Sequence, residues 1–388
     1  MHLNQTPATF SKTLLHSGDL LEISLELDRA LPGKAFLRSN LGNNDLRLQE
    51  IIEQVDLERP AAGRDWHDIE MRQVNAQRYS LLLPMNQVGV FEFKAFFREE
   101  NSQQTYWPRG ENALVKIEPA MCFANNSIYN AFVRQFGANK YAEEMSEEQR
   151  KAEALLDAQK FTVIPPSGRF KDLAAELDFI MGELGFRIIQ LLPIHPLPGN
   201  YARMGRYGSP FAALDLYSVE PALAEFDRKS TPMEQFIALV DEVHARDGML
   251  LLDLPAGHTG WGSVFQVHFP QWFKRREDGS FVNPGAWGVV WEDLCKLDYN
   301  KQELWQEMAE VFLHWCTLGV DGFRCDAGYM IPEPAWTYIV AKVRQQYPDC
   351  IFFLEGLGGS LESTEKLLDT SNMNWAYSEM FQQYSIRE

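Results

Sequence analysis

Charged or titratable side chains follow several apolar segments of the sequence that have the character of buried β-strands. Asp253 ends the run MLLLD, and His258 lies five residues further on. Arg324 and Asp326 are one residue apart in GFRCD, and Glu355 ends the run IFFLE. Removing a carboxylate from water is costly unless it is paired or used in chemistry. At a single position a structural ion pair is as good an interpretation as catalysis, but several such strand ends favour a shared functional site.

Several carboxylates gathered near one arginine are typical of glycoside hydrolysis with retention of configuration. In that reaction one carboxylate attacks the anomeric carbon, and a carboxylic acid about 5 to 5.5 Å away protonates the leaving oxygen. Neighbouring groups must raise the pKa of the acid so that it keeps its proton near neutral pH. An arginine beside the nucleophile orients it by hydrogen bonds and favours its ionised form. A further aspartate and a histidine can bind hydroxyl groups of the reacting sugar.

The segments that carry these residues alternate between helix and strand signals from about residue 120 onward. Helical periodicity is followed by FRIIQLLPI and, later, by MLLLD, and the same succession leads to GFRCD, IFFLE and MNWAYS. Repeated alternation predicts a parallel sheet covered by helices, either a barrel or a doubly wound sheet. A dinucleotide-binding sheet is disfavoured because no GxGxxG follows a strand. In a barrel, the residues that follow the strands form the face that carries functional sites.

The sequence pattern predicts two domains, the second of which contains the strand–helix units. Residues 1–119 contain β-branched and aromatic runs, such as LLEISLEL and VFEFKAFF, separated by turn-forming clusters, which predicts an all-β sandwich domain. Residues 120–388 then form the domain of strand–helix units. Within it, about residues 254–297 are rich in Trp, Gly and His and are long enough to be a small subdomain inserted after MLLLD.

The composition restricts the class of protein and its partners. Hydrophobic residues make up 45% of the 388 residues, which suits a globular chain with a large core. The net charge of −18 disfavours nucleic acid and anionic membrane surfaces as partners. No run approaches the roughly 18 apolar residues of a membrane span, and the N-terminus lacks the apolar core of a signal peptide. The five cysteines follow no CxxC spacing, so we expect reduced thiols, no zinc site and a cytoplasmic location.

The motifs resemble those of the α-amylase family of glycoside hydrolases and occur in that family's order. GVDGFRCDAG is similar to its GFRxD motif, which implies that Asp326 is the nucleophile and Arg324 the arginine beside it. DLPAGH is similar to DxVxNH, which implies that Asp253 and His258 bind substrate. FFLEG resembles the segment that carries the acid/base, here Glu355.

This resemblance covers about residues 120–385 and sets the expectations for fold and activity. It implies a (β/α)8 TIM-type barrel behind the sandwich domain. It also implies a retaining enzyme that acts on the α-glucosidic bonds of α-glucans such as starch, glycogen and maltooligosaccharides. A covalent glycosyl-enzyme would be the intermediate.

Two aromatic residues are candidates for stacking against a sugar ring. YGSPFAALDLYSVEP resembles the family's tyrosine-bearing loop, which implies that Tyr207 binds the ring at the point of cleavage. Trp261 lies in the insertion, where a sugar platform and the core of the subdomain are equally good interpretations. Gly257 stands where many members have an asparagine that helps to hold calcium, so we expect no metal ion and no other cofactor. Tyr329 and Met330 replace the family's frequent Lys-His pair, which leaves the acceptor preference open.

The number of strands differs from that of a complete family barrel. We expect six strands, whereas the family has eight and carries its third catalytic carboxylate, in a His-Asp pair, after the seventh. No His-Asp pair follows Glu355 in the sequence. The pattern therefore predicts a C-terminally truncated chain with about six of the eight units, and low activity of the isolated chain.

The acceptor of the transferred sugar is left open by the sequence. With water the reaction is hydrolysis, whereas a glucanotransferase or a debranching enzyme of the same family would be the alternative. A catalytically weak glucan-binding fragment is a further alternative, which the intact set of Arg324, Asp326 and Glu355 disfavours. The N-terminal domain resembles sandwich modules of branching and debranching relatives, for which packing against the barrel is favoured over glucan binding. The sequence indicates neither the linkage, the chain length nor the oligomeric state.

Overall fold

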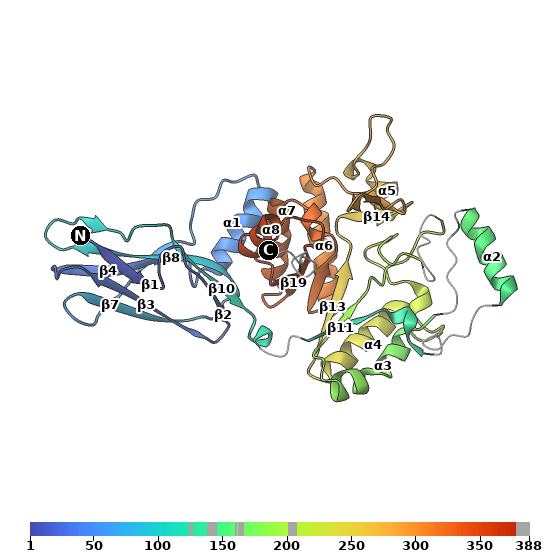
Figure 1. Cartoon of the computed structure of the whole chain (residues 1–388), viewed down its shortest axis with the longest axis horizontal. Coiled ribbons are helices and arrows are strands. Elements are labelled where there is room, and N and C mark those ends of the chain that lie inside the picture. Colours follow the sequence, from blue (N-terminus) through green and yellow to red (C-terminus); the bar gives the residue numbers. More distant parts are fainter. Residues whose placement is uncertain (124–126, 138–145, 160, 162–166, 201–207, 378–388) are drawn as a thin grey trace, which may run out of the picture. The chain divides into compact units, whose positions relative to one another are not determined.

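A computed structural model (Figure 1) describes residues 1–388 except 124–126, 138–145, 160, 162–166, 201–207 and 378–388. The chain forms two compact units, one built mainly from residues before 124 and the other mainly from residues after 126. Over the described ranges, no helix has both the length and the apolar character that crossing a membrane requires.

The N-terminal unit is dominated by strands. Its elements are β1 (Leu3–Thr6), β2 (Lys12–His16), β3 (Leu20–Leu27), β4 (Gly33–Ser39), α1 (Asn44–Asp56), β5 (His67–Glu70), β6 (Arg72–Gln73), β7 (Arg78–Pro84), β8 (Gly89–Glu99), β9 (Thr105–Tyr106) and β10 (Ala113–Glu118). One sheet has the strand order β1-β3-β7-β6, and the other has the order β2-β10-β8-β4-β5, with β9 paired to β8. All pairs are antiparallel except β2 with β10.

The core of this unit lies between the two sheets. Alternate residues of β3, such as Ile23 and Leu25, and of β8, such as Phe91 and Phe93, are fully buried in one apolar cluster. A period of two puts every second side chain on the inner face of its strand, which produces a sandwich. The predicted strand runs at LLEISLEL and VFEFKAFF are confirmed as β3 and β8.

The expectation of an all-β domain was wrong in one respect, because α1 forms a helix within it. This helix buries only a narrow apolar stripe that includes Leu48 and Ile52, one turn apart. The carboxylate of Glu50, on the same helix, accepts hydrogen bonds from the backbone N–H groups of Ala62, Gly63 and Arg64. Tertiary contacts of this kind stabilise a short helix whose own periodicity is weak.

The second unit is built on one parallel sheet, with strands in the order β11-β12-β13-β18-β19-β20. The bounds of these six strands are β11 (Ile128–Ala131), β12 (Ile188–Leu191), β13 (Met249–Leu254), β18 (Gly322–Cys325), β19 (Ile351–Glu355) and β20 (Trp375–Tyr377). Each strand pairs in parallel with the next strand of the sheet along the chain. This sequential order is that of a β/α barrel, because a doubly wound sheet reverses its order at a switch point. The six predicted strands of the alternating region are confirmed.

Helices connect these strands. They are α2 (Glu147–Ala158), α3 (Phe170–Ala174), α4 (Pro232–His244), α6 (Gln302–Thr317), α7 (Glu333–Arg344) and α8 (Leu361–Asp369). α4 begins at a Thr-Pro pair, in which the Thr231 hydroxyl accepts from the N–H of Glu234 and Pro232 occupies the first turn. Gly322 shows why these units pack closely, because a Cβ at that position would lie 2.5 Å from the carbonyl oxygen of Ile351 on β19.

The segment between β13 and α6 forms its own small elements. They are β14 (His258–Gly260), α5 (Val264–His268), β15 (Gly285–Ala286), β16 (Val289–Val290) and β17 (Leu294–Lys296). β14 pairs with β17, and β15 pairs with β16 in a hairpin, both antiparallel. Trp272 is buried and stacks on Phe269 with ring centroids 4.1 Å apart.

Candidate active site

Polar side chains lie at or near the carboxyl ends of four adjacent strands. These side chains are Asp253 on β13, Arg324 on β18, Glu355 on β19 and Tyr377 on β20. Asp253 and Arg324 are partners in the register, as are Glu355 and Tyr377. Because parallel strands end at one edge of the sheet, these side chains meet there. The buried apolar residues that precede each of them hold the strands in place.

One guanidinium group, that of Arg324, contacts three carboxylates. Arg324 Nη1 lies 2.7 Å from Asp253 Oδ1 and 2.7 Å from Asp326 Oδ1. Its Nη2 lies 2.8 Å from Glu355 Oε2. The side chain of Arg324 is only 10% exposed and that of Asp253 only 2%, so solvent screens these charges little. Three carboxylates against one guanidinium leave an excess of negative charge, which favours retention of a proton within the cluster.

Burial raises the pKa of two carboxyl groups in the cluster. Burial raises the pKa of Glu355 to about 7, a rise that the charge of Arg324 opposes and the charge of Asp326 reinforces. Burial also raises the pKa of Asp253 well above its ordinary value, again against the effect of Arg324. Burial disfavours the charge on Arg324, but the surrounding carboxylates outweigh it and raise the pKa of the guanidinium. A carboxylic acid that titrates near neutral pH is suited to general acid/base catalysis.

A strained residue ties Glu355 to the segment of Asp326. Ala327 has φ 46° and ψ 35°, the left-handed conformation that side chains other than glycine rarely adopt. In this conformation its backbone N–H donates to Glu355 Oε2 at 2.8 Å. Such strain persists where the surroundings enforce it, and it is common at functional sites. The strained turn therefore fixes the acid next to the residue that follows Asp326.

His258 lies beside Asp326 as a neutral, buried imidazole. Its Nε2 is 3.5 Å from Asp326 Oδ2, and its side chain is 1% exposed. Burial lowers the pKa of His258 to about 4, so the ring carries no charge at pH 7. Neither ring nitrogen forms a hydrogen bond with another residue that the structure describes. Buried polar atoms are normally bonded, so this ring is available to a ligand hydroxyl.

Sequence comparison finds enzymes that act on glucans. No protein-family model matches the chain. The alpha-1,4-glucan:maltose-1-phosphate maltosyltransferase of Rhodospirillum rubrum is 32% identical over 203 residues, which cover 48% of this chain and 28% of the relative. The enzyme of the same name from Chlorobaculum tepidum is 31% identical over 198 residues, which cover 48% and 29%. The chain thus spans less than a third of the length of the curated relatives it matches.

Comparison of structures finds an α-amylase of Lactobacillus plantarum, with 30% identity, a TM-score of 0.47 and coverage of 60% of this chain and 46% of that one. The type III pullulan hydrolase of Thermococcus kodakarensis has 17% identity, a TM-score of 0.47 and coverage of 88% and 59%. The motifs that converge on Arg324 resemble those of the α-amylase family, and the curated homologues are maltosyltransferases.

Five of the seven site residues expected from the α-amylase-family motifs lie together. Asp253, Arg324, Asp326 and Glu355 share direct bonds, and His258 stands next to Asp326. Tyr207, the sixth, lies outside the described residues. Their chemical roles stay predictions, but the arrangement brings a candidate nucleophile, a candidate acid and a cation into one buried cluster.

Trp261, the seventh, forms contacts within the segment inserted between β13 and α6. Its Nε1 donates to the carbonyl oxygen of Glu292 at 2.7 Å, and its ring meets the edge of Phe281 at 5.9 Å between centroids. The ring that packs on His258 belongs to Trp291, at 6.3 Å between centroids. Trp261 therefore has a structural position in the subdomain, and its role in sugar binding stays a prediction.

Two residues that contact Arg324 were not predicted from the sequence. The hydroxyl of Tyr377 accepts from Arg324 Nε at 2.9 Å and from Nη2 at 2.6 Å. The ring of Phe211 lies 5.8 Å from Arg324 Cζ, in range for a cation–π contact. Tyr377 could have been found, since it ends the strand that follows the Glu355 strand. No spacing in the sequence connects Phe211 to Arg324.

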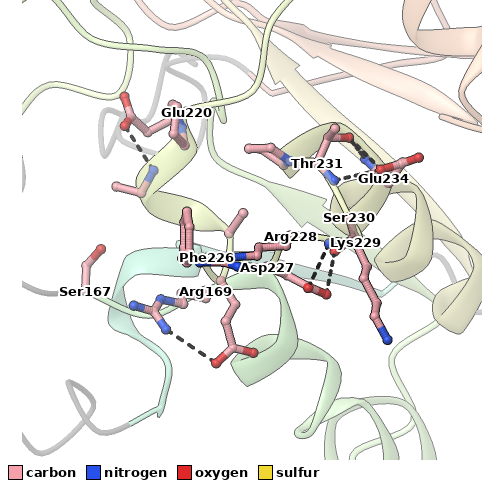
Figure 2. A pocket seen from close by; sticks show the side chains of 15 residues that line it. Ser167, Arg169, Glu220, Phe226, Asp227, Arg228, Lys229, Ser230, Thr231 and Glu234 are labelled. Atoms are coloured by element: carbon pink, nitrogen blue, oxygen red, sulfur yellow. Dashed lines mark hydrogen bonds and ion pairs between the residues drawn. The ribbon is translucent and has the colours of Figure 1, made fainter.

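A separate hollow of about 900 Å³ lies near the start of α3 and of α4 (Figure 2). It shares no lining residue with the Arg324 cluster. Among its charged lining residues, Arg169 lies 3.8 Å from Glu225. Phe226, one of the lining residues, is 90% exposed. The Arg324 cluster, in which one buried guanidinium contacts three carboxyl groups, is the candidate active site.

Proposed function

We propose that this chain carries the glycosyl-transfer centre of a retaining enzyme that acts on α-glucosidic bonds. The observation behind the proposal is that one guanidinium, that of Arg324, binds Asp253, Asp326 and Glu355. A retaining centre needs two carboxyl groups that are close together and differ in protonation. Glu355, whose pKa burial raises to about 7, is suited to be the acid.

The reaction has two steps. Asp326 attacks the anomeric carbon while the bond from that carbon to the leaving oxygen breaks, and Glu355 gives its proton to this oxygen. A covalent glycosyl ester of Asp326 and an ionised Glu355 result. Glu355 then takes a proton from the acceptor hydroxyl as the acceptor oxygen attacks the anomeric carbon and releases Asp326. Two inversions together retain the configuration.

The remaining groups position the sugar and the nucleophile. Arg324 orients Asp326 through a hydrogen bond of 2.7 Å. Asp253 and the neutral imidazole of His258 bind hydroxyl groups of the reacting ring, and Tyr207 would stack on that ring. All five cysteines are buried, and we expect the enzyme to act in the reducing cytoplasm.

Transfer to a sugar acceptor is the first candidate for the second step. The support comes from the sequence relatives, which are maltosyltransferases. Hydrolysis is the outcome whenever water takes the place of the acceptor, because the glycosyl ester is common to both reactions. Incubation with maltooligosaccharides distinguishes the two, since transfer yields products longer than the substrate.

Trapping the ester tests the proposal directly. With α-maltosyl fluoride the leaving fluoride needs no proton, so the Glu355→Gln variant should form the ester and release it slowly. Mass spectrometry should then find one maltosyl group on the peptide that contains Asp326. The Asp326→Asn variant is the control and should stay unlabelled. A label on another carboxylate, or no label together with no turnover by the parent chain, would contradict the proposal.

A further inference from the structure

The hydroxyl oxygen of Tyr377 bridges two nitrogens of Arg324. It accepts from Nε at 2.9 Å and from Nη2 at 2.6 Å. These two nitrogens form an edge of the guanidinium that can bind a carboxylate through two parallel hydrogen bonds. In this chain a single oxygen occupies that edge. Burial raises the pKa of Tyr377, so the hydroxyl keeps its proton and carries no charge at neutral pH.

The carboxyl groups contact the remaining part of the guanidinium of Arg324. Asp253 and Asp326 both accept from Nη1. Glu355 meets the group at Nη2, which lies 2.8 Å from Oε2. Glu355 and Tyr377 are register partners on β19 and β20, and both contact Nη2. The phenol and the candidate acid therefore lie at the same nitrogen of one cation.

We propose that Tyr377 is a positioning residue for the candidate acid: its hydroxyl holds the Nε–Nη2 edge of Arg324 and prevents Glu355 from forming a two-bond pair there. A carboxyl group that accepts two hydrogen bonds from a guanidinium is held in its ionised form. A general acid must instead keep its proton until the leaving oxygen takes it. This inference rests on the proposed function, because it takes Glu355 as the acid.

The other groups around Glu355 come from β13, β18, β20 and the segments that follow β13 and β18. The titratable ones are Arg324, Asp253, Asp326, His258 and Tyr377. Burial raises the pKa of Glu355 to about 7, the charge of Arg324 opposes this rise, and the charge of Asp326 and a hydrogen bond with it reinforce the rise. A second hydrogen bond from Arg324 would strengthen the opposing effect and lower the pKa of Glu355.

Replacing Tyr377 with phenylalanine removes the hydroxyl and keeps the ring, whose edge contact with Phe353 has 5.3 Å between centroids. The ionisation of Glu355 can be followed without substrate from the infrared absorption of its protonated carboxyl group. The signal is the difference between a chain and the same chain with Glu355→Gln.

The midpoint of this titration should lie near pH 7 in the parent. In Tyr377→Phe it should be lower by about 1 pH unit, because Glu355 gains the vacated edge of Arg324. In a chain that turns over maltooligosaccharides, the alkaline limb of the pH–rate profile should move by the same amount.

Tyr217→Phe is the matched control. The hydroxyl of Tyr217 donates to Glu307 at 2.9 Å, outside the Arg324 cluster. This variant also loses a buried tyrosine hydrogen bond, so its melting temperature should fall, but the Glu355 midpoint should equal that of the parent. A lower melting temperature alone therefore does not distinguish the two variants, whereas the midpoint does.

The outcomes separate this inference from the function on which it rests. An unchanged or higher midpoint in Tyr377→Phe refutes the inference, and so does an equal decrease in Tyr217→Phe. A Tyr377→Phe chain that fails to fold shows a purely structural role and refutes it as well. A lower midpoint in a chain that processes no α-glucan supports the positioning of Glu355 and refutes the proposed function alone.

Discussion

Replacing Glu355 with glutamine should stabilise the chain at pH 8 far more than at pH 5. The glutamine amide has the shape of the protonated acid, and its oxygen can still accept from the Ala327 N–H and from Arg324. Only the ionised state of the carboxyl is lost. In the parent, that ionised state is buried among Asp253 and Asp326, and burial is the main reason that the pKa of Glu355 rises to about 7.

The magnitude follows from the two pKa values of this carboxyl. The folded value is about 7 and the ordinary value is 4.5. Between these values the folded chain keeps a proton that the unfolded chain has lost, so the stabilisation by that proton is complete below pH 4.5 and disappears as pH rises through 7. Each pKa unit corresponds to about 1.4 kcal/mol. Ionised Glu355 thus costs the folded state about 3 kcal/mol at pH 8 and less than about 1 kcal/mol at pH 5.

Urea unfolding followed by tryptophan fluorescence measures this effect. Of the ten tryptophans, all except Trp66 and Trp107 lie after residue 126, so the signal reports mainly on the second unit. The difference in unfolding free energy between Glu355→Gln and the parent should grow by about 2 kcal/mol from pH 5 to pH 8. The exposed Glu183→Gln is the control and should show no such growth. A Glu355→Gln difference that is constant or shrinks with pH would refute the raised pKa.

Four further outcomes are expected from the same cluster. Turnover of maltooligosaccharides should fall as pH rises above about 7, since Glu355 then loses the proton it must donate; a rate that is flat from pH 6 to 9 would exclude it as the acid. Arg324→Lys should lower the unfolding free energy by about 3 kcal/mol and turnover by at least about a hundredfold, because an ammonium cannot reach all its partners at once; thermal melts and initial rates measure both. Tyr377→Phe should cost about 1 to 3 kcal/mol, since two N–H groups of Arg324 lose their acceptor; a neutral urea midpoint would contradict this. Cys325→Ala should leave turnover within about twofold, because burial raises the pKa of that thiol far from the range of a nucleophile.

Much of the site could be predicted because its residues follow strands with a clear apolar signature. β13, β18 and β19 are almost entirely buried, so a carboxylate or an arginine within them stands out from its neighbours. The alternation of helices and strands predicts a parallel sheet, in a barrel or a doubly wound arrangement. Those two regularities suffice to place Asp253, Arg324 and Glu355 at one edge of the sheet, and the structure places them there.

Other features depend on contacts that no local pattern encodes. α1 was missed because only a narrow stripe around Leu48 and Ile52 is buried. Phe211 reaches Arg324 from a loop between β12 and α4, far from it in the chain. Trp287, which has a φ of 51°, resembles any other tryptophan in the sequence, since a positive φ leaves no mark on residue type except where glycine or asparagine is present.

The sequence by itself determined which chemical groups are present and which strands carry them. The strands could be located because the periodicity of apolar residues indicates which positions are buried. Only the tertiary structure decided how those groups act on one another. The distances of 2.7 to 2.8 Å between one guanidinium and three carboxyls set the sharing of charge and protons, and burial turns Glu355 into an acid with a pKa of about 7. Electrostatic interaction depends on separation and on exclusion of water, and both are properties of the folded chain.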